Sequence, residues 1–533
     1  MARHWPLTVA VAQCNPSVGN CLTNTLSLAK MCHQAKENGA DLIVTPLMAL
    51  CGHPVGELAD FIGFQEQAHD ALTQFAYLVP KEIPVMLGHA CLIGGKFVEC
   101  IYLVHQEEAT PIVYRIPSSS PMIPIKAANV TINNTRISVF FADMLPTDPD
   151  EVTADILLVC DASGYEPKAF SNRVAKMGAL AKLADRSVVY ANLIGGQDEW
   201  IFDGRSFVLD NQGDTKMQLP AFTQGLAYVS LVNRQIVSTK PSLPIILPSS
   251  KWPVAECYDA IRFSLAEFVR KNGFNQVLIG LSGGLDSALV LAIAVDALGH
   301  DSVTAIMMPS PYTSEESIKD ARDIAHLMDV TYHEIPIQPT YATALRSLDP
   351  LITDLAIGFT EENIQARTRG MLLMTLSNQL GALVLATSNK SEVAVGYSTL
   401  YGDTVGGFAP LKDVYKTQVY EMAAYRNTLS YVIPETIIHK APSAELRHNQ
   451  TDQDSLPNYD VLDAILDLYL EKRLSVDDIA ALGYDRMIIE KVSSLVLRNE
   501  FKRRQAPIGP RLSRSYFTNK LPVTHHFVDE NNT

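Results

Sequence analysis

The chain has 533 residues, of which 47% are hydrophobic and 19% charged, so we expect three or four folded domains, or two large ones, and not a disordered chain. Its 43 lysine and arginine residues are outnumbered by 58 aspartate and glutamate residues, and this negative balance disfavours nucleic acid as a partner. No secretion signal begins the chain and no run of about 18 apolar residues occurs, so we expect a cytoplasmic protein without a membrane segment.

The first 238 residues alternate short apolar runs with amphipathic stretches, which is typical of a layered α/β domain. The expected strands are Leu7–Gln13, Asp41–Thr45, Arg136–Ala142, Ile156–Cys160 and Ser187–Asn192. The expected helices are Leu22–Asn38 and Lys168–Asp185, and Gly94-Gly95 signals a hairpin. The 8 cysteines form no CxxC pair, so neither a zinc site nor a redox motif is indicated.

Residues 239–254 contain four prolines and little periodicity, which indicates a linker. A second domain, 255–533, follows, with strands alternating with helices as in a doubly wound parallel sheet. The expected strands are Val277–Leu281, Val303–Met308, Thr331–Ile335 and Leu383–Thr387. The expected helices are Ala255–Asn272, Ser287–Leu298, Glu315–Met328 and Glu361–Leu380, with a capping box at Thr313 and Glu316 and a stop at Gly381.

The sharpest motif joins the first strand of this sheet to its helix. It reads Gly280-Leu281-Ser282-Gly283-Gly284-Leu285-Asp286-Ser287. Adjacent glycines allow a tight turn that aims backbone N–H groups at an anion, and the serines add hydroxyl donors. A carboxylate at an anion site needs a cation beside it, so Asp286 argues for Mg²⁺ bridging to phosphate. A glycine-rich turn that only caps a helix is the structural alternative.

This loop resembles the pyrophosphate-binding loop of the ATP pyrophosphatases, and the motifs after it narrow the resemblance. They are 308–310, 362–367, 387–392, 396–397, 399–403, 442–446 and 500–505, in that order. Together they resemble NAD synthetase of the long, glutamine-dependent type, over about residues 255–525. The resemblance implies a fold of the ATP pyrophosphatase or adenine nucleotide alpha hydrolase type. It also implies ATP-dependent amidation of nicotinic acid adenine dinucleotide to NAD.

The resemblance also implies roles for single residues. ATP contacts are implied for Gly280 to Ser287, Thr387, Lys416 and Ser443, and metal or catalytic roles for Asp286 and Glu392. Contacts with the dinucleotide are implied for Asn363, Arg367, Glu392 and Lys502. Each has a structural alternative: Glu392 could pair with Lys390 or Lys412, and Arg367 or Lys502 could be ordinary surface charge.

The N-terminal half resembles the nitrilase/amidase superfamily, most clearly at 10–16, 39–44, 192–199 and 202–204. In the long NAD synthetases this half hydrolyses glutamine with a glutamate, a lysine and a cysteine. The resemblance implies the glutamate after Pro46 and the cysteine at the end of the strand 137–141, but Leu47 and Phe141 stand there. The lysine position cannot be aligned, and Lys126 is the nearest lysine. We therefore expect an α/β sandwich that is catalytically degenerate.

Another cysteine could in principle replace the missing nucleophile. Cys160 precedes Asp161 at a strand end, and Cys51 has Glu57 nearby in sequence. The segment at Cys160 fits the strand after the nucleophile better, which favours a buried, unreactive thiol.

The sequence thus predicts an NAD synthetase, a carbon–nitrogen ligase that uses ATP, Mg²⁺ and free ammonia and forms a homo-oligomer. One alternative has glutamine hydrolysed by unrecognised residues or by a partner, and another is a non-catalytic nucleotide-binding protein.

Overall fold

The computed structural model describes residues 6–93, 95–115, 128–148, 152–232, 234–240, 252–348, 358–513 and 522–523. The chain divides into two compact units, Met1–Lys251 and Trp252–Thr533. Each unit has its own sheets and its own hydrophobic core. Among the described residues, no helix combines the length and the apolar character needed to cross a bilayer.

The first unit contains two large sheets and a small hairpin. One sheet consists of β1 (Leu7–Gln13), β2 (Leu42–Val44), β3 (Val85–Ile93), β4 (Lys96–His105), β5 (Glu108–Arg115), β14 (Gly225–Val232) and β15 (Gln235–Lys240). The other consists of β6 (Ala128–Ile132), β7 (Thr135–Phe141), β8 (Ile156–Cys160), β9 (Ser187–Ala191), β12 (Phe207–Leu209) and β13 (Thr215–Gln218). The strand orders are β15-β14-β1-β2-β3-β4-β5 and β13-β12-β9-β8-β7-β6. The hairpin pairs β10 (Ile194–Gln197) with β11 (Trp200–Asp203).

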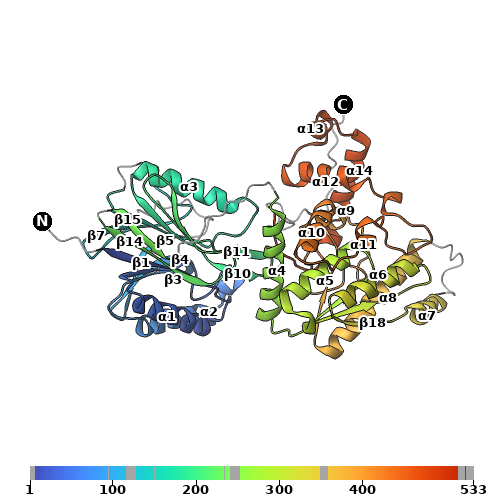
Figure 1. Cartoon of the computed structure of the whole chain (residues 1–533), viewed down its shortest axis with the longest axis horizontal. Coiled ribbons are helices and arrows are strands. Elements are labelled where there is room, and N and C mark those ends of the chain that lie inside the picture. The colour runs from blue at the N-terminus through green and yellow to red at the C-terminus, as the bar shows by residue number, and fades with distance from the viewer. Residues whose placement is uncertain are drawn as a thin grey trace. The chain divides into compact units, whose positions relative to one another are not determined.

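Helices cover the outer faces of the two sheets. α1 (Cys21–Glu37) and α2 (Ile62–Leu78) lie on one side of this unit and α3 (Ala169–Ala184) on the other, as Figure 1 shows. The main core takes apolar side chains from α1, α2 and both sheets, and a second core joins the β6–β13 sheet to α3. The unit is therefore an α/β sandwich, as the sequence predicts.

The central strands have the expected ranges because they are apolar on both faces. All five residues of β8 and of β9 are buried, and β7, β8 and β9 pair in parallel. The expected hairpin occurs where β3 pairs antiparallel with β4, with Gly95 at φ 77°; Gly94 lies outside the described residues. A short 3₁₀ helix, η1 (Gly56–Asp60), precedes α2.

The second unit is built on a parallel sheet of four strands, as predicted. These are β16 (Val277–Gly280), β17 (Val303–Met307), β18 (Thr331–Glu334) and β19 (Leu383–Leu385). Their order is β18-β17-β16-β19, and every neighbouring pair is parallel. From β16 the chain adds β17 and then β18 toward one edge of the sheet. It then crosses back, and β19 pairs with the other side of β16. Ligands of open α/β sheets bind where the order reverses in this way, at the carboxyl ends of the strands.

The helices of the second unit lie on both faces of this sheet and beyond its edge. The α-helices are α4 (Val254–Lys271), α5 (Leu285–Leu298), α6 (Glu315–Leu327), α7 (Gln338–Leu348), α8 (Phe359–Leu380), α9 (Lys390–Val395), α10 (Lys416–Leu429), α11 (Glu435–His439), α12 (Tyr459–Leu466), α13 (Val476–Ala481), α14 (Arg486–Arg498) and α15 (Glu500–Arg503). Short 3₁₀ turns η3 (His300–Ser302) and η4 (Asp452–Asp454) and a π turn η5 (Asp467–Glu471) also occur. α7 and α8 share a core with the sheet, whereas α9, α12, α13 and α14 form another.

The predicted N-terminal cap of α6 is wrong, and the predicted stop of α8 is confirmed. α6 begins after Ser314, whose hydroxyl accepts from the backbone N–H of Ser317, while Thr313 instead accepts from the N–H of Ser310. The turn before the helix uses Thr313, so the cap falls one residue later. Gly381 ends α8 in the left-handed conformation, at φ 63°. The sequence did not predict α7.

Candidate active site

The loop between β16 and α5 is held in shape by its own serines. The Ser287 hydroxyl lies 3.0 Å from that of Ser282 and accepts the Ser282 N–H at 3.2 Å, and the Gly284 N–H donates to the Ser282 hydroxyl. Gly283 has φ +78°, and a Cβ there would lie 2.3 Å from the carbonyl oxygen of Ser317. Only glycine can therefore occupy this turn, because both the backbone conformation and the close approach exclude a side chain.

A cavity of about 280 Å³ lies at the carboxyl ends of the strands. It is lined by these predicted residues: Gly280, Leu281, Ser282, Gly284, Leu285, Asp286, Ser287, Thr387, Glu392, Lys416 and Ser443. They come from the loop after β16, the turn after β19, α9, α10 and the segment after α11. Segments far apart in the sequence thus meet at the place where the strand order reverses.

Two charged side chains face each other at the start of α5 and α10. Lys416, 3% exposed, forms an ion pair with Asp286, which also accepts a hydrogen bond from the Asn389 amide at 3.0 Å. Burial by itself would lower the pKa of Lys416, but the carboxylates of Asp286 and Glu392 hold that pKa above its ordinary value. The lysine therefore stays charged beside the loop.

Glu392 lies in the first turn of α9 and faces the same cavity. Burial, and then the charge of Asp286, raise the pKa of Glu392 well above its ordinary value. The proposed surface ion pairs do not form: Lys390 contacts Asp413 at 2.7 Å and Glu471 at 2.6 Å, and Lys412 donates to the carbonyl of Pro507. Glu392 is thus an acidic residue that lines the cavity and forms neither of these two ion pairs.

The carboxylates of the cavity suit Mg²⁺ only if phosphate supplies the remaining metal ligands. No group of three or more His, Cys, Asp or Glu residues suited to a metal occurs in the described part of the chain. Asp286 and Glu392 provide two carboxylates, and burial together with the charge of Asp286 raises the pKa of Glu392. Mg²⁺ commonly takes one or two carboxylates together with substrate phosphates and water. The two side chains fit that pattern.

Of the four residues expected on the dinucleotide side, Glu392 lines the cavity and the other three lie together around a second loop. Arg367 donates to the carbonyl of Leu400 at 3.2 Å, and Asn363 accepts from the hydroxyl of Thr399 at 2.9 Å. Lys502 donates to the carbonyls of Gly396 and Ser398, both at 2.8 Å. None of the three lines the cavity, but the loop that they hold does, through Tyr397 and Thr399. Burial lowers the pKa of Lys502.

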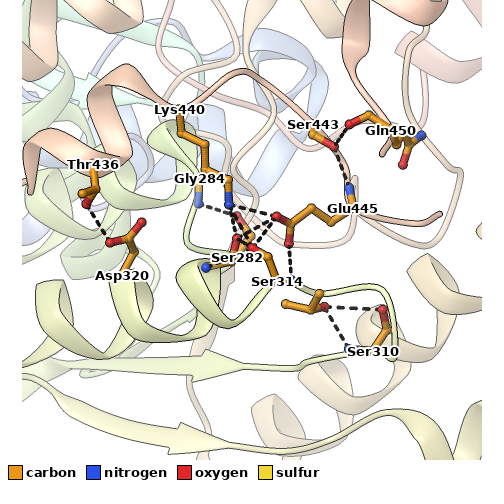
Figure 2. Close-up of polar contacts among 12 residues, drawn as sticks. Ser282, Gly284, Ser310, Ser314, Asp320, Thr436, Lys440, Ser443, Glu445 and Gln450 are labelled. Atoms are coloured by element: carbon orange, nitrogen blue, oxygen red, sulfur yellow. Dashed lines mark hydrogen bonds and ion pairs between the residues drawn. The ribbon is translucent and has the colours of Figure 1, made fainter. Parts of the chain in front are cut away.

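Several further charged side chains of the cavity were not predicted, Asp403 and Asp452 among them. Arg369, Lys440 and Glu445 line it, and burial lowers the pKa of Arg369 to about 10. Glu445 lies inside the motif 442–446, in which the family resemblance implies an ATP contact only for Ser443. The hydroxyl of Ser443 donates to the carbonyl of Gln450 at 2.6 Å and accepts from the N–H of Glu445, so it shapes this segment (Figure 2).

In the first unit, apolar side chains occupy the two positions where catalytic residues would be expected. Leu47 is 0% exposed and Phe141 is 1% exposed. The Arg115 guanidinium lies 5.0 Å from the Phe141 ring centre and pairs with Glu99 and Asp143. Lys126 lies outside the described residues.

The thiols considered as replacements are buried. Burial raises the pKa of Cys160 to about 12 and, together with a nearby thiol, raises the pKa of Cys51 well above its ordinary value. Glu57 is exposed on η1. A thiolate nucleophile at either cysteine is therefore disfavoured.

The parallel sheet, its reversal at β16 and the serine- and glycine-rich loop facing the cavity define the second unit as a domain of the ATP pyrophosphatase type. Residues 257–506 match the family model described as NAD synthase. The glutamine-dependent NAD(+) synthetase of Acinetobacter baylyi is 40% identical over 535 residues, covering 96% of each chain. That of Xylella fastidiosa is 39% identical, covering 98% of this chain and 99% of the relative. The chain therefore belongs to the family of glutamine-dependent NAD(+) synthetases, which are carbon–nitrogen ligases.

Solved structures agree with this assignment. The glutamine-dependent NAD+ synthetase of Acinetobacter baumannii, in complex with ADP, has a TM-score of 0.75 and 36% identity, covering 97% of this chain and 98% of that one. The synthetase of Cytophaga hutchinsonii shares the fold, with a TM-score of 0.82 at 18% identity over 98% of both chains. The predicted family and fold are confirmed, and the non-catalytic alternative is set aside. The relatives' names support glutamine dependence better than free ammonia.

Proposed function

We propose that the chain uses ATP and Mg²⁺ to amidate nicotinic acid adenine dinucleotide, giving NAD, AMP and pyrophosphate. A carboxylate oxygen of the nicotinate attacks the α-phosphorus of ATP, and pyrophosphate leaves with the electrons of the broken P–O bond. Ammonia then adds to the carbonyl carbon of the adenylate, loses a proton, and AMP leaves. The observation that carries this proposal is the cavity in which the Gly280–Ser287 loop, Glu392 and Lys416 meet.

The residues of the cavity have different roles according to their positions. The N–H groups and hydroxyls of the loop bind the phosphates, and the Lys416 ammonium adds a fixed positive charge. Asp286 and Glu392 would hold Mg²⁺, which would neutralise charge on the transferring phosphates. Thr387 and Ser443 also line the cavity.

The dinucleotide is placed beside the loop 396–403. Asn363, Arg367 and Lys502 bind it directly or through this loop, which all three contact. By family resemblance, the Lys502 contact is made across a boundary between synthetase domains of a cytoplasmic homo-oligomer. We place the domain boundaries at 1–238 and 255–533.

Two nitrogen donors have support from different observations. The relatives' names favour glutamine. The apolar, buried Leu47 and Phe141 favour free ammonia, because neither side chain can accept a proton or attack an amide. We propose ammonia as the donor that the isolated chain uses, with glutamine hydrolysis left to unrecognised residues or to a partner.

The test is a donor assay on the purified full chain with saturating ATP, Mg²⁺ and nicotinic acid adenine dinucleotide. Ammonium should support NAD formation at a rate that rises with pH, because free NH₃ is the attacking species. Glutamine should give background turnover and no glutamate. Glutamate released one to one with NAD would overturn the ammonia proposal, and absence of NAD and pyrophosphate with either donor would overturn the proposed reaction.

A further inference from the structure

The carboxylate of Glu445 is surrounded by hydrogen-bond donors. The hydroxyls of Ser314 and Ser317 donate to it at 2.9 and 2.8 Å, and the N–H of Ser314 donates at 3.3 Å. The Lys440 ammonium forms an ion pair with it at 2.8 Å and also contacts both hydroxyls. An ammonium, two hydroxyls and a backbone N–H are the groups that commonly bind phosphate oxygens.

This cluster lies next to the phosphate loop. Ser317 is the residue whose carbonyl would clash with a Cβ at Gly283, so the first turn of α6 packs directly on the loop. Ser317, Lys440 and Glu445 line the same cavity as Ser282, and Figure 2 shows Lys440 and Glu445 beside the labelled Ser282 and Gly284.

Glu445 remains an anion in this position. Burial raises the pKa of Glu445. The hydrogen bonds from Lys440, Ser317 and Ser314, together with the charge of Lys440, outweigh burial and hold this pKa below its ordinary value. A carboxylate here repels phosphate oxygens that enter the cavity. The same lysine cannot fully neutralise both anions, so a bound polyphosphate and Glu445 compete for Lys440.

The ion pair is not needed to fix the segment around it. The hydroxyl of Thr436 donates to Asp320 at 2.7 Å and so ties α11 to α6 independently. The Ser443 hydroxyl links the backbone at Glu445 to the carbonyl of Gln450. Lys440 can therefore exchange its partner while the surrounding backbone stays attached (Figure 2).

We propose that Lys440 is a further phosphate-contacting residue, which pairs with Glu445 before nucleotide enters the cavity and which transfers to the terminal phosphates of ATP, or to pyrophosphate, when these bind. This inference rests on the proposed ATP site and deepens it. The ligand class is a di- or triphosphate, because AMP lacks the β- and γ-phosphates that would compete with Glu445 for Lys440. Lys440 thus makes the cavity selective for polyphosphate over monophosphate.

Calorimetric titration of the full chain with Mg²⁺-pyrophosphate, a non-hydrolysable ATP analogue and AMP tests the inference. Lys440→Ala should weaken pyrophosphate and analogue binding about tenfold or more, as expected for one charge-assisted hydrogen bond, with AMP affinity changed less than twofold. Lys440→Arg should keep most of the affinity. Glu445→Gln, which has the same shape without the charge, should tighten pyrophosphate binding several-fold.

Matched surface variants serve as controls. Lys472→Ala and Glu435→Gln change exposed residues whose side chains are 57% and 65% exposed, and should leave all three affinities unaltered. Equal losses for AMP and pyrophosphate in Lys440→Ala, or weaker pyrophosphate binding in Glu445→Gln, would overturn the inference alone. Failure of the unmodified chain to bind the ATP analogue would overturn the proposed function as well.

Discussion

The side chain of Asn389 connects Asp286 to Glu392. Its amide nitrogen donates to the Asp286 carboxylate at 3.0 Å, while its carbonyl oxygen accepts the backbone N–H of Glu392 at 3.0 Å and caps α9. One amide therefore sets the separation of the two acids that face the cavity. The metal and phosphate chemistry proposed for this site depends on that separation.

Asn389→Ala should reduce turnover at least tenfold and lower the free energy of unfolding by about 1 kcal/mol, the usual cost of losing an N-cap. Steady-state kinetics and thermal unfolding measure the two effects. Asn458→Ala removes the cap of α12, at an exposed residue, and should lower stability similarly without changing turnover. Equal turnover in the two variants would contradict a role for Asn389 in placing Asp286.

Asp286→Asn should reduce Mg²⁺-dependent pyrophosphate release by at least about a hundredfold, because a charged ligand is lost where phosphate charge concentrates. It also leaves the buried ammonium of Lys416 without its ion-pair partner. A pyrophosphate-release assay measures the effect. Asp301→Asn, at a side chain that is 95% exposed, is the control and should behave normally. Near-normal release by Asp286→Asn would place the metal elsewhere.

Gly283→Ala should abolish nucleotide binding and destabilise the second unit. The left-handed conformation costs roughly 1–3 kcal/mol for a side chain, and the contact with the Ser317 carbonyl adds to this cost. Gly299→Ala is a close control, since Gly299 has φ +84° but a Cβ there meets nothing within 4 Å. Thermal unfolding and ATP-analogue titration should separate the two. If both variants bind the ATP analogue equally well, the close approach of α6 to the loop does not matter for nucleotide binding.

Lys502→Ala should raise the KM for nicotinic acid adenine dinucleotide about tenfold and the KM for ATP much less. The variant loses both hydrogen bonds that hold the loop 396–398, which lies on the proposed dinucleotide side. Initial-rate kinetics with each substrate varied in turn measures the split. Lys491→Ala removes a comparable lysine-to-carbonyl bond at the surface and should change neither constant. Equal changes in both constants for Lys502→Ala would remove its assignment to the dinucleotide.

The first unit should lose stability in acid through His89. Burial lowers the pKa of His89 to about 4, whereas the unfolded chain takes up the proton near pH 6.5. The unfolded state therefore binds more protons between these values, and stability falls as the pH drops from 6.5 to 4, by up to about 3 kcal/mol. His89→Gln should flatten the pH dependence of thermal unfolding in this window. An unaltered slope in His89→Gln would exclude His89 as the source.

The sequence predicts the order of elements well because its signals are local. The strands around β8 and β16 are short apolar runs, and Gly381 ends a helix by its own backbone conformation. α7 was missed: it has only 11 residues, and only Tyr341 among them is buried.

Within the site, motif resemblance located Asp286, Glu392 and Lys416, but it did not indicate Lys440. The position of Lys440 depends on how the segment after α11 returns to the first turn of α6, and sequence spacing carries no information about that return. Likewise, Asn363 and Lys502 lie 139 positions apart and meet only through the loop 396–403.

The walls of the cavity are collected from residues 280 to 452, and β16 acquires its neighbour β19 only after about a hundred further residues have been made. A chain synthesised only as far as β18 can form the phosphate loop but has neither Glu392 nor Lys416 to face it. Contacts of such long sequence separation form late, because loop closure must precede them. If nucleotide binds there as proposed, it stabilises only chains that extend at least through Asp452, and an ATP analogue should distinguish these from shorter chains.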